Sequence, residues 1–179
     1  MAEPNPIAVI FAHPAFERAR VAPVLVDAAA SLAGVAIRDL YELYPDFTVD
    51  VEAEQQALAP ARAVVLQFPL YWYSGPALLK EWLDLVLTNG FAYGERGTAL
   101  KGKTLACVVS AAGAGSAFQP KGHSRFTMAE FLRPYEQTAR VCDMRWAPPL
   151  VIHGAPRLSD NQLAREAGRY RAYLQDLAS

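Results

Sequence analysis

Three aromatic residues in one short loop are the strongest chemical signal in this chain. Tyr71, Trp72 and Tyr73 lie between Pro69 and Pro76, directly after a short apolar run that is rich in β-branched residues. Pro69 cannot donate to a strand ladder, and Pro76 suits the first position of a helix. Ligands of open α/β sheets bind at the carboxyl ends of strands, so these rings and their backbone amides favour a flat, partly polar ligand. The alternative is that the rings are core or interface aromatics.

A second candidate loop, residues 13–20, joins the first expected strand to the first expected helix. A loop that leads into a helix N-terminus gathers free amides and the positive end of the helix dipole, and both favour a phosphate group. His13 follows the strand directly, and Arg18 and Arg20 can add charge-assisted hydrogen bonds. Solvated arginines and a histidine that only packs are the alternatives. The loop has no GxGxxG pattern, so the Rossmann dinucleotide fingerprint is absent.

Small residues follow a third expected strand. They let a ligand approach the backbone closely, and the candidate binding residues are Ala111, Ala112, Gly113, Ala114 and Gly115. A long segment with His123 then leads to the next helix, and long loops in compact domains are commonly lids or binding loops. A histidine side chain can donate a proton near neutral pH, but a plain surface histidine is an equally good interpretation.

The elements that must position these loops alternate along the chain. Apolar runs predict strands at residues 7–12, 35–40, 63–68, 104–110 and 150–153. Helical patterns fall at residues 21–32, 52–58, 77–87, 126–141 and 159–177. Pro134 should break or kink its helix, and Ser159 or Asp160 can cap the last one. Strands separated by helices imply a parallel sheet covered on both faces, and residues 1–179 are expected to form a single domain.

Composition argues against several functional classes. The net charge of −1 gives no general field for nucleic acid. The two cysteines, Cys107 and Cys142, do not make a disulfide framework, which points to a reducing cytoplasm. No apolar run reaches the roughly 20 residues that span a bilayer. Cysteines, histidines and carboxylates do not cluster as metal ligands, so no metal site is expected.

Several motifs together resemble the flavodoxin-like NAD(P)H:quinone oxidoreductases, a family that includes the ancillary proteins of glutathione-gated Kef potassium-efflux systems. The motifs are residues 69–73, 76–82, 90–94 and 146–149, and the similarity spans essentially the whole chain. Residues 39–41 and 43–47 are similar to the Kef ancillary branch in particular. The resemblance implies an α/β fold, a flavodoxin-like three-layer αβα sandwich with a five-stranded parallel sheet in the order 2-1-3-4-5.

The resemblance also implies an activity and a set of ligands. It implies two-electron, ping-pong reduction of a quinone by NADH or NADPH through bound FMN, or alternatively FAD. It implies a homodimer with its active sites at the subunit interface. His13 would lie near the flavin phosphate or ribityl chain, Trp72 against the edge or face of the ring, and residues 111–115 beside the ring. The backbone from Leu70 to Tyr73, after Pro69, would contact the ring.

Two departures from the family pattern fall at the phosphate end. Where the family has a serine and an asparagine after His-Pro, this chain has Ala19 and Ala22. Each lost hydrogen bond removes about 1 kcal/mol or more, and Arg18 and Arg20 would have to compensate. Phe118 lacks the hydroxyl of the family's second active-site aromatic residue, so the catalytic candidates are Trp72 and His123, with solvent as the alternative proton donor.

A second function from a different class stays open. The chain could be a regulatory ancillary subunit on the cytoplasmic domain of a potassium/proton antiporter, peripheral at the inner face of the membrane, with flavin or nucleotide bound only structurally. The two alanines favour this alternative because a regulatory relative tolerates a weakened phosphate site. An electron-carrier flavodoxin is disfavoured, since such carriers are strongly acidic and this chain has a pI of about 6.3.

Overall fold

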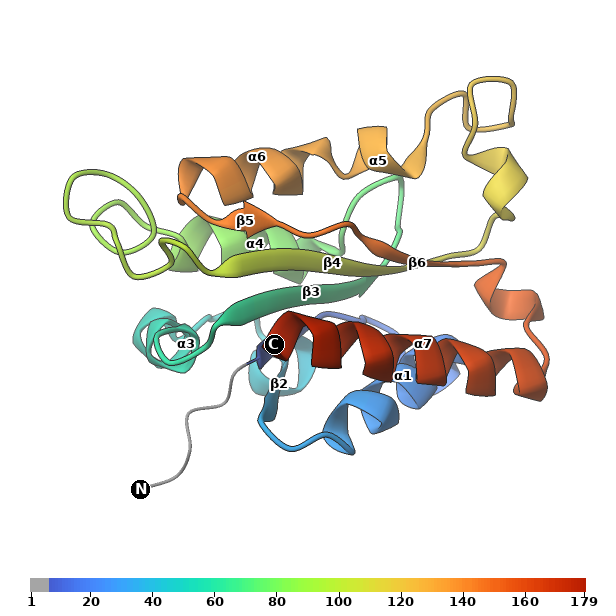
Figure 1. The fold of residues 1–179 in the computed structure, drawn as a ribbon, viewed down its shortest axis with the longest axis horizontal. Coiled ribbons are helices and arrows are strands. Elements are labelled where there is room, and N and C mark those ends of the chain that lie inside the picture. The colour runs from blue at the N-terminus through green and yellow to red at the C-terminus, as the bar shows by residue number, and fades with distance from the viewer. Residues whose placement is uncertain (1–6) are drawn as a thin grey trace.

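A parallel sheet between two layers of helices carries the site (Figure 1). The computed structural model describes residues 7–179. Its strands in that range are β1 (Ile7–Phe11), β2 (Val35–Asp39), β3 (Ala63–Pro69), β4 (Thr104–Ala111), β5 (Arg145–Trp146) and β6 (Leu150–His153). They are parallel in the order β2-β1-β3-β4-β5, with β6 also paired to β4, which confirms the expected flavodoxin-like order.

The helices cover both faces of this sheet. They are α1 (Val21–Ala30), α2 (Leu40–Leu43), α3 (Val51–Leu58), α4 (Ala77–Val86), α5 (Met128–Phe131), α6 (Arg133–Val141) and α7 (Asp160–Ala178). Short 3₁₀ turns are η1 (Phe16–Arg18), η2 (Gly115–Ala117) and η3 (Ala155–Arg157). Figure 1 shows α1 and α7 together on one face, and α5 and α6 on the other. No helix within residues 7–179 is long and apolar enough to cross a membrane.

The central strands are buried on both faces, which explains their continuous apolar runs. In β3, Val64 and Leu66 belong to the core under α3, α4 and α6, whereas Val65 belongs to the core under α1 and α7. Every residue of β3 is buried, including the polar Gln67. In the sequence, strands buried on both faces form continuous apolar runs, without alternation of apolar and polar residues.

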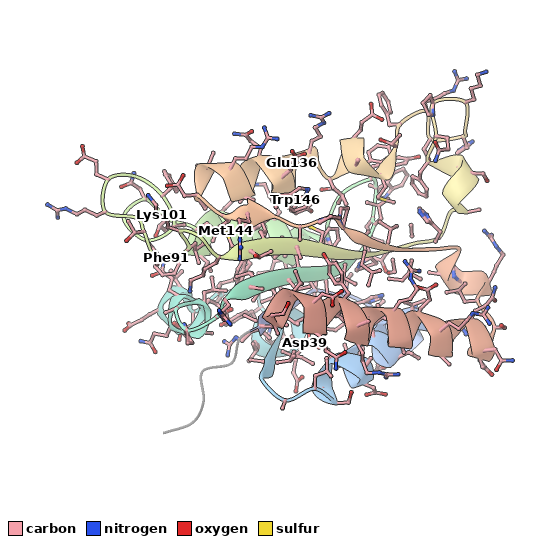
Figure 2. The ribbon with its side chains drawn as sticks, in the orientation of Figure 1. Asp39, Phe91, Lys101, Glu136, Met144 and Trp146 are labelled. Atoms are coloured by element: carbon pink, nitrogen blue, oxygen red, sulfur yellow. The ribbon has the colours of Figure 1, made fainter. Side chains whose placement is uncertain are left out.

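The fifth position of the sheet is divided between two short strands. Both strands pair with β4. Trp146 of β5 lies opposite Leu105, and Leu150 of β6 lies opposite Val108, further toward the carboxyl end of β4. Pro148 and Pro149 lie between them and have no N–H to continue the ladder. The sequence predicted only the second half. Trp146 packs against the core on the α6 side (Figure 2).

Three other local features refine the expected elements. The helix predicted over 126–141 is broken at Leu132 into α5 and α6, with Pro134 in the first turn of α6. Ser159, not Asp160, caps α7 through a capping box with Gln162. The short helix α2 was not expected, and Asp39 caps it by accepting hydrogen bonds from two backbone amides.

Candidate functional site

Two adjoining cavities lie at the carboxyl ends of β1, β3 and β4. The first, of about 370 Å³, lies at the start of α1, and we call it the α1 cavity. The second, of about 280 Å³, is lined by the aromatic loop after β3 and by the segment after β4, and we call it the aromatic cavity. Leu70 and Ala112 line both cavities, so the two form one trough. The size is typical of small-molecule sites.

The trough brings together nearly all residues that the sequence singled out. The α1 cavity is lined by His13, Arg18, Arg20, Pro69 and Tyr71 besides the two shared residues. The aromatic cavity is lined by Trp72, Tyr73, Ala111, Gly113 and His123. Ala114 and Gly115 line neither cavity, because the chain turns into η2 there and the α-carbon of Gly115 faces the ring of His153.

The aromatic loop is a tight turn with an unusual backbone. The Tyr71 N–H donates to the Ser74 carbonyl at 2.9 Å, and the Ser74 N–H donates back to the Tyr71 carbonyl at 3.0 Å. Between them, Trp72 has φ +48° and Tyr73 has φ +63°, the pattern of a type I′ turn. Such turns normally use Asn and Gly, and a bulky residue in this region costs roughly 1–2 kcal/mol. Strain of this kind clusters at ligand sites.

Three contacts hold this turn in place. The Leu70 N–H donates to the Ser110 carbonyl at 2.8 Å, which ties the turn to β4. The Gly75 N–H donates to the buried Tyr135 hydroxyl of α6 at 3.0 Å. The Tyr73 ring stacks on Phe131, with the ring centroids 4.9 Å apart. Trp72 is 93% exposed, so its ring remains available to a ligand or to another chain.

His13 supplies a neutral hydrogen-bond donor to the α1 cavity. Only 8% of the residue is exposed, and burial lowers its pKa. Its Nδ1 accepts a hydrogen bond from the Ala15 N–H at 3.2 Å. A neutral imidazole whose Nδ1 is an acceptor carries its proton on Nε2, so Nε2 can donate to a ligand oxygen.

The start of α1 supplies the rest of the polar lining. No side chain caps this helix, and Val21 and Ala22 of its first turn line the cavity. The free amides and the helix dipole therefore face a space that suits an anion. Arg18 also lines the cavity, whereas the Arg20 guanidinium donates to the Asp160 carboxylate at 3.0 Å.

Both departures from the family pattern lie on this wall. Ala19 and Ala22 line the α1 cavity, so neither a hydroxyl nor a side-chain amide is offered there. The remaining donors that line the cavity are the helix amides, His13 Nε2, the Ser110 hydroxyl and the guanidinium groups of Arg18 and Arg20. This donor set still fits a phosphate monoester.

The aromatic cavity has a rigid floor. Phe118 is buried between Phe131 and His153, with ring centroids 6.2 Å and 5.3 Å away. A Cβ on Gly113 would come within 3.0 Å of the Phe118 ring, so the backbone must pass close to that ring. A flat ligand can lie against such a surface.

His123 sits on the outer wall of the aromatic cavity. The segment that carries it folds back on η2, because the Ser124 N–H donates to the Ala117 carbonyl at 3.0 Å. A Cβ on Gly122 would lie 2.4 Å from the Ser116 carbonyl oxygen, so this fold requires glycine. The side chain of His123 is thereby placed beside the ligand space.

Sequence reasoning missed part of the lining. Ala155 and Pro156 of η3 line the α1 cavity, and the Arg157 guanidinium donates to the Ala112 carbonyl at 3.3 Å. These residues follow β6, so the carboxyl-edge argument applied to the fifth strand points to them. Ser110 lines the α1 cavity and Ser124 lines the aromatic cavity.

Known proteins resemble this chain along almost its whole length. A family model described as a flavodoxin-like fold matches residues 5–174. The glutathione-regulated potassium-efflux system ancillary protein KefG of Pectobacterium carotovorum is 43% identical over 179 residues, which are 100% of this chain and 96% of that protein.

Two solved structures extend the comparison. General stress protein 14 of Treponema denticola, in complex with FMN, has a TM-score of 0.92 and 37% identity, over 96% of this chain and 98% of that chain. An NADPH-quinone reductase from P. pentosaceus has a TM-score of 0.86 and 36% identity, over 93% of this chain and 96% of that chain. With the sheet order and the position of the trough, these similarities show that the chain belongs to the flavodoxin-like NAD(P)H quinone reductase family.

Proposed function

We propose that this chain is an FMN-dependent NAD(P)H:quinone oxidoreductase whose cofactor lies along the trough. The observation that carries the proposal is the division of the trough into two chemically different ends. The α1 cavity offers neutral and cationic donors, and the aromatic cavity offers flat apolar surfaces. A phosphate at the first end and an isoalloxazine ring at the second match these linings. FMN is preferred to FAD because the similar T. denticola structure contains FMN.

The chain's own residues bind and orient the cofactor in this proposal. His13 Nε2, the amides at the start of α1 and Arg18 hold the phosphate. The backbone of residues 69–73 and of residues 111–113 contacts the ring, and Trp72 and Tyr73 shield it from water. When bound, the flavin would supply two-electron hydride chemistry between NADH or NADPH and a quinone. His123 delivers a proton to the quinone oxygen.

A homodimer is part of the proposal. The loop between α4 and β4 holds the 90–94 motif, and Figure 1 shows it at the end of the sheet opposite the trough. Phe91 and Lys101 are labelled in this loop in Figure 2, on the side where β4 begins. Because the motif cannot reach the trough of its own chain, a second subunit would bring its motif there. Light scattering on the purified protein tests this, and a monomer at working concentrations would oppose it.

One observation favours a second role in potassium efflux. The relative described above is named as an ancillary protein of such a system. The segment shared with that branch exposes two large apolar side chains, Leu43 and Phe47. Association with the cytoplasmic domain of a potassium/proton antiporter is tested by co-purification and by restored efflux in a deletion strain. Neither result would be expected of a free enzyme.

The enzyme proposal is tested by cofactor analysis and a simple assay. Purified protein should be yellow, or become so with FMN, and the extracted cofactor should have the mass of FMN. It should then oxidise NADH or NADPH with a simple quinone. Protein that stays colourless and inactive after addition of FMN and of FAD would refute the enzyme proposal.

A further inference from the structure

A buried amide below the α1 cavity is bonded at only one end. Gln67 of β3 is 3% exposed, and its Oε1 accepts a hydrogen bond from the Tyr170 hydroxyl of α7 at 2.7 Å. That bond fixes the orientation of the amide. Nε2 has no hydrogen-bond partner among the residues of the described range. Buried polar groups are almost always satisfied, so an orphaned amide in a native core calls for an explanation.

A small void lies beside this amide. It measures about 10 Å³, and Gln67, His13, Ala22 and Ser110 are among the residues that line it. His13, Ala22 and Ser110 also line the α1 cavity, so the void is the floor of that cavity. By the same measure, one water molecule needs roughly 10–15 Å³ and at least two polar partners. The void therefore has room for one water and polar groups to hold it.

We propose that Gln67 is a positioning residue for the cofactor phosphate, acting through one water bound in this void. The water accepts a hydrogen bond from Gln67 Nε2 and donates to Ser110 Oγ and to a phosphate oxygen in the α1 cavity. The ligand half of this inference rests on the proposed function; the water site itself does not. The bond from Tyr170 keeps the amide nitrogen turned toward the void.

The same wall explains why this chain needs such a water. Ala19 and Ala22 bring no polar side-chain atom to the α1 cavity. Ala22 also lines the void, so its small side chain leaves the path between the void and the cavity open. A water held by Gln67 and Ser110 then adds a polar group to the floor in place of a longer side chain.

Three variants separate this role from a purely structural one. Gln67→Met keeps approximately the same shape and removes both the Nε2 donor and the Oε1 acceptor of the Tyr170 bond. Gln67→Glu replaces the donor with a carboxylate, and Tyr170→Phe removes only the bond at the other end of the amide. The dissociation constants of FMN and of riboflavin are measured for each by quenching of flavin fluorescence. Thermal denaturation monitors the stability of each variant.

The expected result is selective for phosphate. Gln67→Met should weaken FMN binding roughly fivefold to tenfold, as for one lost hydrogen bond, and leave riboflavin binding unchanged. Gln67→Glu should weaken FMN binding further because the carboxylate repels phosphate. Tyr170→Phe should lower stability and change the ratio of the two affinities less than Gln67→Met does, because the Nε2 donor is still present although less firmly oriented. Equal losses for FMN and riboflavin, or the same ratio in Gln67→Met as in Tyr170→Phe, would overturn the phosphate role.

A crystal structure of the ligand-free protein provides a readout that needs no cofactor. It should show one water within hydrogen-bonding distance of both Gln67 Nε2 and Ser110 Oγ, and an empty void would overturn the water site. Wild-type protein that binds neither flavin would instead refute the proposed function and the phosphate role together. The two failures are therefore distinguishable.

Discussion

At the scale of single residues, the α1 cavity depends on a histidine that is held neutral. Burial lowers the pKa of His13 below its ordinary value, and the bond from the Ala15 amide at 3.2 Å fixes the proton on Nε2. A neutral imidazole can donate a hydrogen bond to a phosphate oxygen without placing a buried positive charge in the protein. Protonation of Nδ1 would break the bond from Ala15.

The lowered pKa predicts a loss of stability in mild acid. Below the ordinary histidine pKa of about 6.5, the unfolded chain binds a proton at His13 before the folded chain does. The free energy of unfolding should therefore fall as the pH is lowered through about 6.5. Urea denaturation measures this, and His13→Gln should make the decline less steep. Burial also lowers the pKa of His153, so His153→Gln should do the same. If the unfolding free energy of both variants depends on pH as in the wild type, the lowered pKa values of His13 and His153 are contradicted.

The two arginines of the β1–α1 loop should differ in their effect on FMN binding. Both arginines line the α1 cavity, but the Arg20 guanidinium is bound to Asp160, whereas Arg18 lies in the short turn η1. Arg18→Gln should weaken FMN binding by about 1 kcal/mol, an effect that salt reduces. Arg20→Gln is the matched control and should have a smaller effect. Titration of each variant at low and high salt checks this, and a larger effect at Arg20 would contradict it.

At the scale of elements, the turn from Tyr71 to Ser74 stores strain at the ring end of the trough. Positive φ angles at Trp72 and Tyr73 are kept by the two backbone bonds of the turn and by the Gly75 bond to Tyr135. Natural chains retain such strain where function requires a fixed geometry.

Relief of this strain should increase stability and reduce binding. Trp72→Gly removes a side chain that is almost fully exposed, and glycine adopts positive φ freely. The strain of about 1–2 kcal/mol exceeds the entropic cost of glycine, about 0.5–1 kcal/mol, so the variant should gain roughly 0.5–1 kcal/mol. Trp72→Ala is the control, because it removes the ring but keeps the strain. Both variants should bind FMN more weakly, and a Trp72→Gly protein less stable than Trp72→Ala would contradict the interpretation.

The elements show which features a sequence can reveal. Continuous apolar runs predicted β1 to β4 and β6, because buried parallel strands leave that pattern. The two-residue strand β5 and the four-residue helix α2 are too short to leave a periodic signal. The positive φ angles at Trp72 and Tyr73 contradict local preference and could not be predicted. The loops after β1, β3 and β4 could be predicted because they follow strands and carry aromatic, charged or small residues. The residues that η3 adds to the lining, Ala155 and Pro156, have no polar side chain that would mark a site.

At the scale of the whole molecule, a buried carboxylate joins the elements on the face opposite α1. Glu54 of α3 is fully buried and accepts hydrogen bonds from the Tyr44 hydroxyl at 2.6 Å, from Trp82 Nε1 at 2.9 Å and from Arg38 Nε at 3.1 Å. Burial and the bond to Glu54 raise the pKa of Tyr44 to about 12, so its hydroxyl stays a donor. This network links β2, α3 and α4 and does not line the trough.

Loss of this carboxylate should therefore lower the free energy of unfolding without changing FMN binding in the trough. Glu54→Gln leaves the Arg38 guanidinium, whose side chain is 25% exposed, without a charged partner and should cost about 1.5–3 kcal/mol of unfolding free energy. Glu52→Gln, on the exposed face of the same helix, should change stability by less than about 0.5 kcal/mol. Chemical denaturation gives both values. At a temperature where both variants are folded, their FMN affinities should match that of the wild type. Weaker FMN binding by Glu54→Gln alone would contradict a purely structural role for Glu54.

In the proposed function, one trough holds a flavin that passes electrons from NAD(P)H to a quinone. The most direct measurement follows the visible absorption of the FMN-loaded protein without oxygen, first with NADPH or NADH and then with a quinone. We expect the absorption to bleach with the nucleotide and to return with the quinone, each half-reaction proceeding without the other substrate. An absorption that does not change when either nucleotide is added would contradict the account.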